Sequence, residues 1–188
     1  MDNPHPWAET LPLLYEHLWA RLIRGVHDRH APARHPVLAT VSAQGGPQAR
    51  TVVLRGADKS AATLTFYTDL HSAKVEELRA SPLAALHVWD ASAHLQTRIE
   101  ASVTLLTGDD VSEIWQQLPE HSRLAYSSGP APGTPIADSL AYSKTPDQAA
   151  FAVLRLDIQA IDALHLGPDH RRARFTRADD WAGQWLVP

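Results

Sequence analysis

The hydrophobic spacing of this sequence changes near residue 36, and that change constrains the fold more than any other feature. In residues 7–29 apolar side chains recur at intervals of three and four, which is the spacing of one helix face. These positions are Leu11, Leu14, Leu18, Leu22 and Val26. Beyond Pro36, short runs of β-branched and aromatic residues follow one another with turn-forming residues between them. We therefore expect a long helix over Trp7 to Arg29, within an N-terminal region of residues 1–30, followed by a mainly β (α+β) fold.

The turns between the strand-like runs are short, which favours antiparallel pairing over the long crossovers of a βαβ sheet. Strands are expected at 37–41, 48–54, 63–68, 84–89, 95–106, 151–156, 161–166, 173–176 and 185–187. Short helices are expected at 73–80, capped by Ser72, and at 109–118. Residues 56–60 predict a turn, and residues 127–148, rich in Pro, Gly and Ser, predict a loop. The pattern predicts a small antiparallel barrel with peripheral helices.

Length and composition set further limits. A chain of 188 residues suits a single domain, 1–188, that buries roughly 70% of the surface its unfolded form exposes. The absence of Cys excludes disulfides, thiolate nucleophiles and iron–sulfur clusters. The chain has 17 Lys and Arg against 21 Asp and Glu, no signal-peptide pattern, and no apolar run near the ~20 residues of a membrane span. We expect a cytoplasmic protein that binds neither a membrane nor nucleic acid.

Common enzyme signatures are absent from the sequence. It contains no G-x-G-x-x-G, Walker A, G-x-S-x-G or H-E-x-x-H motif, which disfavours Rossmann dehydrogenases, P-loop NTPases, α/β-hydrolases and zinc proteases. His27 and His30 have the spacing of two metal ligands on one helix face. Cationic side chains at a helix C-terminus also interact favourably with the helix dipole. We favour this second interpretation and expect no metal site.

Two segments suggest a phosphate site. Arg50 and Arg55 bracket a strand whose alternation sends them to opposite faces. A second strand, ending in Phe66-Tyr67-Thr68, runs into a helix start that contains Ser72 and Lys74. Backbone N–H groups at a helix start suit a phosphate, although a capping serine followed by a surface lysine would look the same.

Two further segments offer polar groups to a ligand. Gln96 can present both a donor and an acceptor to the edge of a heterocycle. The segment 167–175 contains several arginines, and Arg177 follows it. Charges of this kind also protect the exposed edge of a sheet, so the segment alone does not identify a site.

The order and spacing of these segments resemble the pyridoxamine 5′-phosphate oxidase family of FMN-binding split barrels. The matching stretches are Arg50-Thr-Val-Val-Leu-Arg55, Phe66-Tyr-Thr-Asp69, Ser72-Ala-Lys74, Trp89, Gln96-x-Arg-Ile-Glu100 and His170-Arg-x-x-Arg174-Phe175. The resemblance extends from about Val37 to the C-terminus. It implies an FMN-binding split β-barrel, a homodimer with non-covalent FMN at the subunit interface, and redox chemistry on a small-molecule substrate.

The resemblance also implies roles for single residues. It places Arg50, Ser72 and Lys74 at the FMN phosphate, with Arg55 at the end of the same strand as Arg50. The other cofactor-binding residues that it implies are Thr51, Val52, Val53, Tyr67, Thr68, Gln96, His165 and Arg174. Gln96 would hydrogen-bond the flavin ring, and His165 stands where the family has a tryptophan. Ser122 and Arg171 are implied as substrate contacts.

The sequence departs from the family's pattern mainly where the substrate would bind. Ile114 and Leu118 stand at the positions of a tyrosine and an arginine that hold the substrate phosphate, so only Ser122 is kept. A leucine cannot replace a bidentate arginine in binding a phosphate dianion. Ala73 replaces one arginine of the FMN phosphate site, whereas Lys74 remains. These departures favour FMN binding over oxidation of pyridoxamine 5′-phosphate itself.

The sequence therefore predicts an FMN-binding flavoprotein oxidoreductase whose substrate is unassigned. The alternative is a non-catalytic flavin-binding or cofactor-sensing protein. A nucleic-acid module that uses Arg171, Arg172, Arg174 and Arg177 is a weaker alternative, because no extended basic face or aromatic platform accompanies them.

Overall fold

The computed structural model describes residues 5–188, so the first four residues of the predicted 1–30 region lie outside it. Its α-helices are α1 (Leu11–His27), α2 (Ala73–Ala80), α3 (Ser112–Gln117) and α4 (Glu120–Arg123). Its 3-10 turns are η1 (Pro6–Ala8), η2 (Pro32–Arg34), η3 (Gly108–Val111), η4 (Gln148–Ala150) and η5 (Arg177–Asp179). Its strands are β1 (Val37–Val41), β2 (Pro47–Thr51), β3 (Leu54–Asp58), β4 (Thr63–Asp69), β5 (Leu83–Asp90), β6 (Leu95–Leu106), β7 (Ser128–Gly129), β8 (Ser143–Lys144), β9 (Phe151–His165), β10 (Arg171–Thr176) and β11 (Gln184–Leu186).

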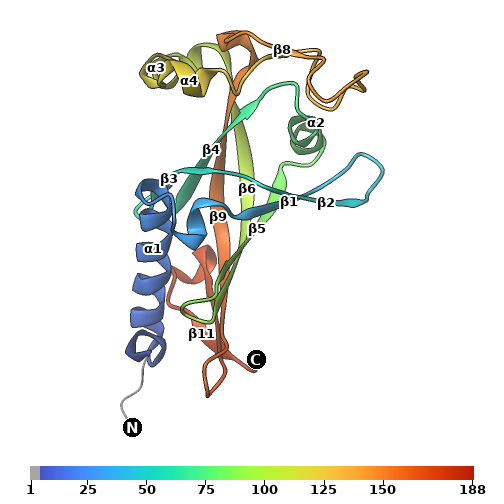
Figure 1. Cartoon of the computed structure of the whole chain (residues 1–188). Coiled ribbons are helices and arrows are strands. Elements are labelled where there is room, and N and C mark those ends of the chain that lie inside the picture. The colour runs from blue at the N-terminus through green and yellow to red at the C-terminus, as the bar shows by residue number, and fades with distance from the viewer. Residues whose placement is uncertain (1–4) are drawn as a thin grey trace.

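A nine-stranded antiparallel sheet forms the body of the molecule. Its order is β11-β10-β9-β6-β5-β1-β2, with β4 added against β9 and β3 against β4. Strand β9 pairs with β4, β6 and β10 and runs through the height of the molecule (Figure 1). This architecture confirms the predicted mainly β fold with peripheral helices.

The two strands predicted at 151–156 and 161–166 are one strand, β9, of 15 residues. Polar residues interrupt the apolar run in the sequence, but pairing continues through them. Glu100 pairs with Ala160 and Ala101 with Ile158, so the register passes over Gln159. One extra residue in a ladder is a β-bulge, which bends a strand without ending it. The prediction of two strands was therefore wrong.

The single strand predicted at 48–54 is divided in two. Strands β2 and β3 lie on either side of Val52 and Val53. The N–H of Val52 donates to the carbonyl of Pro36 at 3.0 Å, outside either ladder. Because β2 pairs with β1 whereas β3 pairs with β4, the chain changes partners at this point. Part of the turn predicted at 56–60 belongs to β3.

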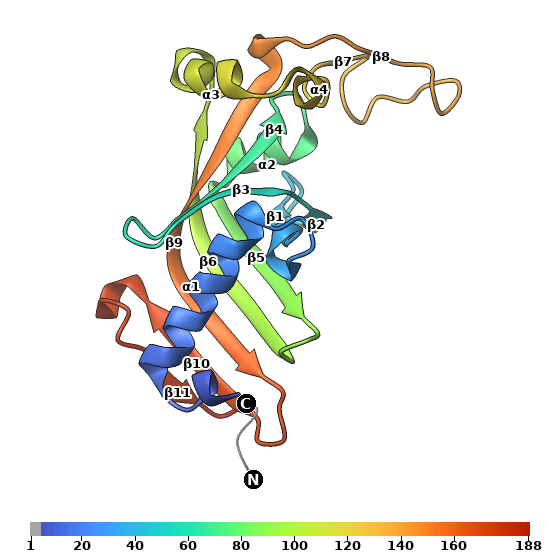
Figure 2. The ribbon, with the colours of Figure 1, turned by 60° about the vertical axis from the view of Figure 1, so that its left-hand side comes forward.

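One end of the molecule is covered by α3, α4 and the chain that follows them. Residues 127–148 extend from this end as an arm that contains the β7–β8 pair (Figure 2). The helix predicted at 109–118 is divided between η3 and α3. A small core lies beneath it and consists of Val111, Trp115, Tyr126, Phe151 and Val153.

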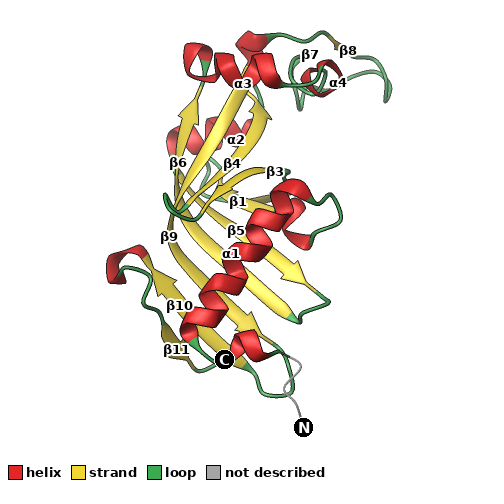
Figure 3. Cartoon of the chain, turned by 90° about the vertical axis from the view of Figure 1, so that its left-hand side faces the viewer, coloured by secondary structure: helices red, strands yellow, loops and turns green. Residues whose placement is uncertain are grey.

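Helix α1 crosses one face of the sheet (Figure 3). It begins at Leu11 rather than at Trp7, because Thr10 Oγ1 accepts the Leu13 N–H at 3.4 Å and caps the helix there. Its buried side chains are Leu14, Leu18, Trp19 and Leu22. Full burial of one such side chain contributes about 1.5–3 kcal/mol, so this face fixes α1 to the core. Among residues 5–188, no helix is long and apolar enough to cross a membrane.

Candidate functional site

A hollow of about 380 Å³ opens beside β3, the end of β4 and the start of α2; we call it the β3–β4 pocket. Its lining brings together predicted residues from two separate stretches of sequence. These are Thr51, Val52, Val53, Arg55, Tyr67, Thr68, Ser72 and Lys74. The two stretches meet because β3 pairs with β4 after the chain changes partners at Val52.

Three polar side chains converge where the β3–β4 pocket meets α2. Lys74 Nζ donates to Thr68 Oγ1 at 3.1 Å and to Ser72 Oγ at 3.0 Å. The Ser72 hydroxyl donates to the carbonyl of Asp69 at 2.8 Å. Ser72 thus occupies the predicted cap position, but its side chain makes no capping bond to the helix. The Val75 N–H donates to the Ser72 carbonyl at 2.9 Å, so the first turn of α2 presents the N–H groups of Ala73 and Lys74. N–H groups at a helix start, beside an ammonium, suit an anion.

The charge of Lys74 is held in an unfavourable environment. Burial lowers the pKa of Lys74, and the neighbouring Arg50 lowers it further, whereas Asp69 and Glu77 oppose this effect. An anion bound beside Lys74 would favour its charged form. The electrostatics and the hydrogen bonds therefore point to the same kind of ligand.

Arg55 provides a second positive group in the β3–β4 pocket. Its guanidinium lies 5.7 Å from the centroid of the Tyr67 ring, within the range of a cation–π contact. Burial raises the pKa of the Tyr126 hydroxyl, and the adjacent Arg55 opposes that shift. Within residues 5–188, no carboxylate forms an ion pair with Arg55. Arg55 can therefore hold an anionic group of a ligand.

Arg50 lies next to the β3–β4 pocket but is not part of its lining. Its guanidinium donates to Glu77 Oε2 at 2.7 Å and also to the Thr40 hydroxyl. Glu77 belongs to α2, so this ion pair ties β2 to the helix that starts at the pocket.

Gln96 and Arg174 lie on the sheet face that points away from α1. Phe175 packs against Tyr15 of α1, with ring centroids 5.1 Å apart, so its neighbour Arg174 points to the opposite side. There Arg174 donates to both carboxylate oxygens of Glu100, at 3.0 and 2.8 Å. Gln96 Oε1 lies 3.3 Å from His87 Nε2. Within one chain, neither Gln96 nor Arg174 reaches the β3–β4 pocket.

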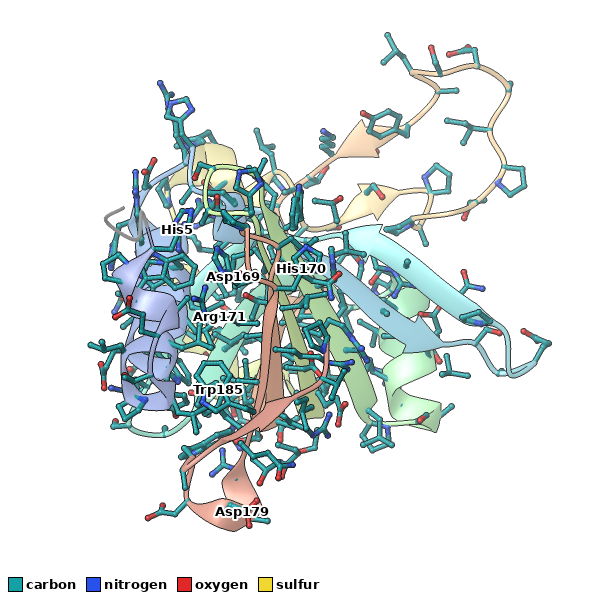
Figure 4. All side chains as sticks on the ribbon, turned by 90° about the horizontal axis from the view of Figure 1, so that it is seen from below. His5, Asp169, His170, Arg171, Asp179 and Trp185 are labelled. Carbon is teal, nitrogen blue, oxygen red and sulfur yellow. The ribbon has the colours of Figure 1, made fainter. Side chains whose placement is uncertain are left out.

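His165 and Arg171 lie together on the α1 side of the sheet, where they pair in register. His165 is buried, its ring lies 5.0 Å from Trp7, and neither ring nitrogen has a hydrogen-bond partner among the described residues. Burial lowers the pKa of His165 to about 4. Arg171 lies 3.8 Å from Asp169, at the turn seen end-on in Figure 4. Within one chain, the sheet therefore lies between these two residues and the pair Gln96 and Arg174.

The helices beside the β3–β4 pocket have apolar side chains where the family resemblance expects phosphate ligands. Ile114 and Leu118 pack against the small core of Trp115 and Tyr126. Arg123 lies over Trp115 and donates to backbone carbonyls, so it is already engaged. Ser122 lies in α4 and does not line the pocket.

Sequence reasoning missed two polar residues of the pocket lining, Asp69 and Tyr126. Asp69 is buried and accepts the N–H of His71 and the N–H of Ser127, both at 2.8 Å. It thereby joins the start of α2 to the segment that contains Tyr126. The only sequence signal was indirect: an acid directly after a strand and an aromatic residue directly before the Pro/Gly-rich loop. No group of three or more metal-ligating side chains occurs in the part of the chain that the structure describes.

Comparison with known proteins gives a consistent result. Residues 16–107 match the family model described as "Pyridoxamine 5'-phosphate oxidase, FMN-binding domain". The chain is 34% identical to the pyridoxine/pyridoxamine 5′-phosphate oxidase of Pseudomonas fluorescens (strain Pf0-1) over 125 residues, which are 65% of this chain and 56% of the relative. The enzyme of the same name from Cyanothece sp. (strain PCC 7425 / ATCC 29141) is 41% identical over 87 residues, 46% of this chain and 40% of the relative. The chain thus spans about half the length of the curated relatives it matches.

Solved structures share the fold over the whole chain. A pyridoxamine 5′-phosphate oxidase-related, FMN-binding protein from Nostoc punctiforme PCC 73102 has a TM-score of 0.76 and 28% identity, with 100% of both chains covered. PhzG from Burkholderia lata 383, in complex with tetrahydrophenazine-1-carboxylic acid, has a TM-score of 0.72 and 19% identity, with 100% of this chain and 98% of that one covered. The family match includes every predicted residue of the β3–β4 pocket, whereas His165, Arg171 and Arg174 lie beyond it.

Proposed function

Because the chain belongs to the pyridoxamine 5′-phosphate oxidase family of FMN-binding split barrels, we propose that it is an FMN-dependent oxidoreductase acting on a small molecule. The observation that carries this proposal is the convergence of Thr68, Ser72 and Lys74 at the start of α2. It provides one ammonium, helix N–H groups and two hydroxyls whose protons can turn from the Asp69 carbonyl to a ligand. A phosphate monoester requires donors of these kinds.

The residues of the β3–β4 pocket fit FMN. Lys74, Ser72 and Thr68 would bind the phosphate, and the irregular backbone at Val52 and Val53 would lie along the flavin. Bound FMN supplies a ring that exchanges a hydride equivalent with the substrate. Tyr67 and the buried Tyr126 would keep water from that ring, and Arg55 would orient an anionic group of the substrate. Each role follows from the charge and position of a side chain in the pocket.

We propose that the active form is a homodimer in which each FMN lies between two subunits. Gln96 and Arg174 cannot meet the β3–β4 pocket of their own chain, so their proposed flavin contacts require a second chain. The same sheet face exposes apolar side chains, among them Leu83 and Trp89, which are 63% and 44% exposed. A partner subunit would bury this surface.

The proposed substrate lacks a phosphate group. The apolar Ile114 and Leu118 are packed into the small core, and Arg123 is held by backbone carbonyls. Arg55 is then the cation beside the flavin that could bind an anionic group of the substrate. One arginine suits a single carboxylate better than a phosphate dianion. His165 and Arg171 lie on the α1 side of the sheet and do not line this pocket.

The first experiment is to purify the protein, record its absorbance spectrum and titrate it with FMN. A yellow protein with one FMN per chain is the expected result. A colourless protein that does not bind added FMN would contradict the proposal.

The second experiment distinguishes an enzyme from a flavin carrier. An enzyme loses its flavin colour with an organic donor and regains it in air over repeated cycles. A protein that holds FMN but never cycles with any donor or acceptor would be the non-catalytic alternative.

A further inference from the structure

Glu77, Arg50 and Thr40 form a closed ring of hydrogen bonds close to the start of α2. Arg50 Nη2 donates to Glu77 Oε2 at 2.7 Å, and the Thr40 hydroxyl donates to the same oxygen at 2.5 Å. Arg50 Nη1 closes the ring by donating to Thr40 Oγ1. The three residues come from α2, β2 and β1, so the ring fixes the Arg50 guanidinium relative to the helix.

This ring is withdrawn from solvent. Thr40 is 4% exposed and Glu77 is 9% exposed, whereas the side chain of Arg50 is 23% exposed. A buried carboxylate is costly unless it is paired and hydrogen-bonded, and the ring satisfies both conditions. The arginine is therefore held firmly on one side and is open on the other.

The open side of Arg50 retains most of its donors. A guanidinium has five N–H groups in a fixed planar fork. The ring uses one N–H of Nη1 and one of Nη2, which leaves three outside the ring. These three are enough for a bidentate contact with a phosphate.

Arg50 also lies within electrostatic reach of the ammonium that lines the β3–β4 pocket. Arg50 lowers the pKa of Lys74, whereas Glu77 raises it, so all three charges act on one another. Without Glu77, two cations would face each other with less compensation before any ligand arrives. The carboxylate thus allows Arg50 and Lys74 to remain close together.

We propose that Glu77 is a positioning residue for FMN: it holds Arg50 beside Lys74 so that both cations meet the FMN phosphate, and it never touches the cofactor itself. The inference rests on the proposed function, since it needs an FMN phosphate at the start of α2. It assigns to a buried acid a role in recognising an anion, which the sign of its own charge would not predict.

The test compares FMN with riboflavin, which has the same ring but no phosphate. Glu77→Ala removes both the charge and the hydrogen-bond acceptor that hold Arg50. We expect it to weaken FMN binding roughly tenfold, a change of about 1.4 kcal/mol, and to leave riboflavin binding unchanged. Glu77→Gln retains an acceptor oxygen of the same shape, and we expect it to restore FMN affinity to within roughly threefold of the wild type.

The matched control is Glu76→Ala. Glu76 is the adjacent acid of the same helix, but it is exposed and pairs with Arg79 instead. We expect this variant to bind FMN and riboflavin as the wild type does. Equal losses of FMN and riboflavin in Glu77→Ala would show that Glu77 has only a structural role. Unchanged FMN binding would show that Arg50 does not depend on Glu77.

If Glu77→Ala does not fold, Thr40→Val tests the same ring while keeping the shape of the strand residue. We expect roughly threefold weaker FMN binding and unchanged riboflavin binding; no difference between the two ligands would overturn the inference. A wild-type protein that binds neither FMN nor riboflavin would instead overturn the proposed function. The two failures are therefore distinguishable.

Discussion

Lys74 keeps a positive charge where both burial and a neighbouring arginine oppose it. Its hydrogen bonds to Thr68 and Ser72 use two of its three donors without neutralising that charge. A bound phosphate would supply the missing negative charge and relieve the repulsion between Lys74 and Arg50. At the scale of single residues, the strongest determinant of cofactor affinity should therefore be charge rather than shape.

The first prediction is that Lys74→Ala weakens FMN binding by roughly 10- to 100-fold, because hydrogen bonds to charged groups contribute about 1.5–3 kcal/mol. Arg50→Ala should act in the same direction. Titration of apoprotein, followed by quenching of flavin fluorescence, measures both. Lys59→Ala is the control, since Lys59 bonds to Glu16 outside the pocket. If Lys59→Ala and Lys74→Ala had the same effect, the phosphate site would be misplaced.

The second prediction concerns His165, whose pKa burial lowers to about 4. Because an unfolded imidazole titrates near 6.5, the unfolded chain binds more protons between about pH 4 and 6.5. The contribution of His165 to the free energy of unfolding is full above pH 6.5 and is lost as the pH falls toward 4. Burial also lowers the pKa of His17 to about 4, so His17 acts in the same direction.

Urea unfolding at several pH values between 7 and 5 measures this effect. We expect the free energy of unfolding of His165→Leu to vary less steeply with pH than that of the wild type, because one of the two histidines with a lowered pKa is gone. Parallel slopes for the two proteins would contradict the assignment to His165.

At the scale of elements, α1 and η2 approach each other at Gly25. A Cβ built on Gly25 would lie 2.8 Å from the carbonyl carbon of Ala33, closer than real Cβ contacts allow. This close approach explains a glycine in the last turns of a helix that otherwise favours long side chains.

The third prediction is that Gly25→Ala destabilises the protein by about 1–3 kcal/mol through overpacking. It should do so even though alanine is favoured over glycine in a helix by about 1 kcal/mol. Ala20→Gly, at an exposed position of α1, is the comparison and should cost about 1 kcal/mol through helix propensity alone. Thermal and urea unfolding measure both variants. Stabilisation by Gly25→Ala would show that η2 can move away.

Elements whose pattern is complete within one segment were predictable from the sequence. Helix α1, the β4–α2 junction and the strands β5 and β6 show regular periods of their own. The break at Val52 and Val53 was not predictable, because two valines favour a strand and only the pairing partners differ on either side. The continuity of β9 depends on a bulge opposite β6, which local spacing does not record.

The same distinction holds for the site. Ser72 and Lys74 were predictable because they lie in one short stretch after a strand. Asp69 and Tyr126 were missed because their importance comes from contacts between distant segments, such as the bond from Ser127 N–H to Asp69. Nothing in the sequence distinguishes Glu77 from its neighbour Glu76, because its ring with Arg50 and Thr40 joins three separate elements.

At the scale of the whole molecule, the two sheet faces differ. One face lies against α1, and the other exposes Leu83 and Trp89 around Gln96 and Arg174. The proposed dimer uses this second face, so association and flavin binding should be linked.

The fourth prediction is that Leu83→Asp weakens dimerisation at least tenfold and lowers the FMN content of the purified protein. A buried, unpaired carboxylate in an apolar interface is strongly unfavourable. Sedimentation velocity and the flavin-to-protein absorbance ratio measure the two effects. Leu13→Asp, 50% exposed on α1, is the control and should leave both unchanged. A wild-type protein that is monomeric yet fully loaded with FMN would contradict the proposed interface.

Strand β9 has a consequence for how the chain is made. It is the shared partner of β4 and β6, but 59 residues (165 − 106) separate the end of β6 from the end of β9. At about 5–20 residues per second, a ribosome needs about 3–12 s to synthesise that stretch. Throughout this interval β4 and β6 each lack the neighbour that will cover one edge, and open edges invite aggregation. The nascent chain therefore exposes these strand edges for a period set by the position of a single late strand.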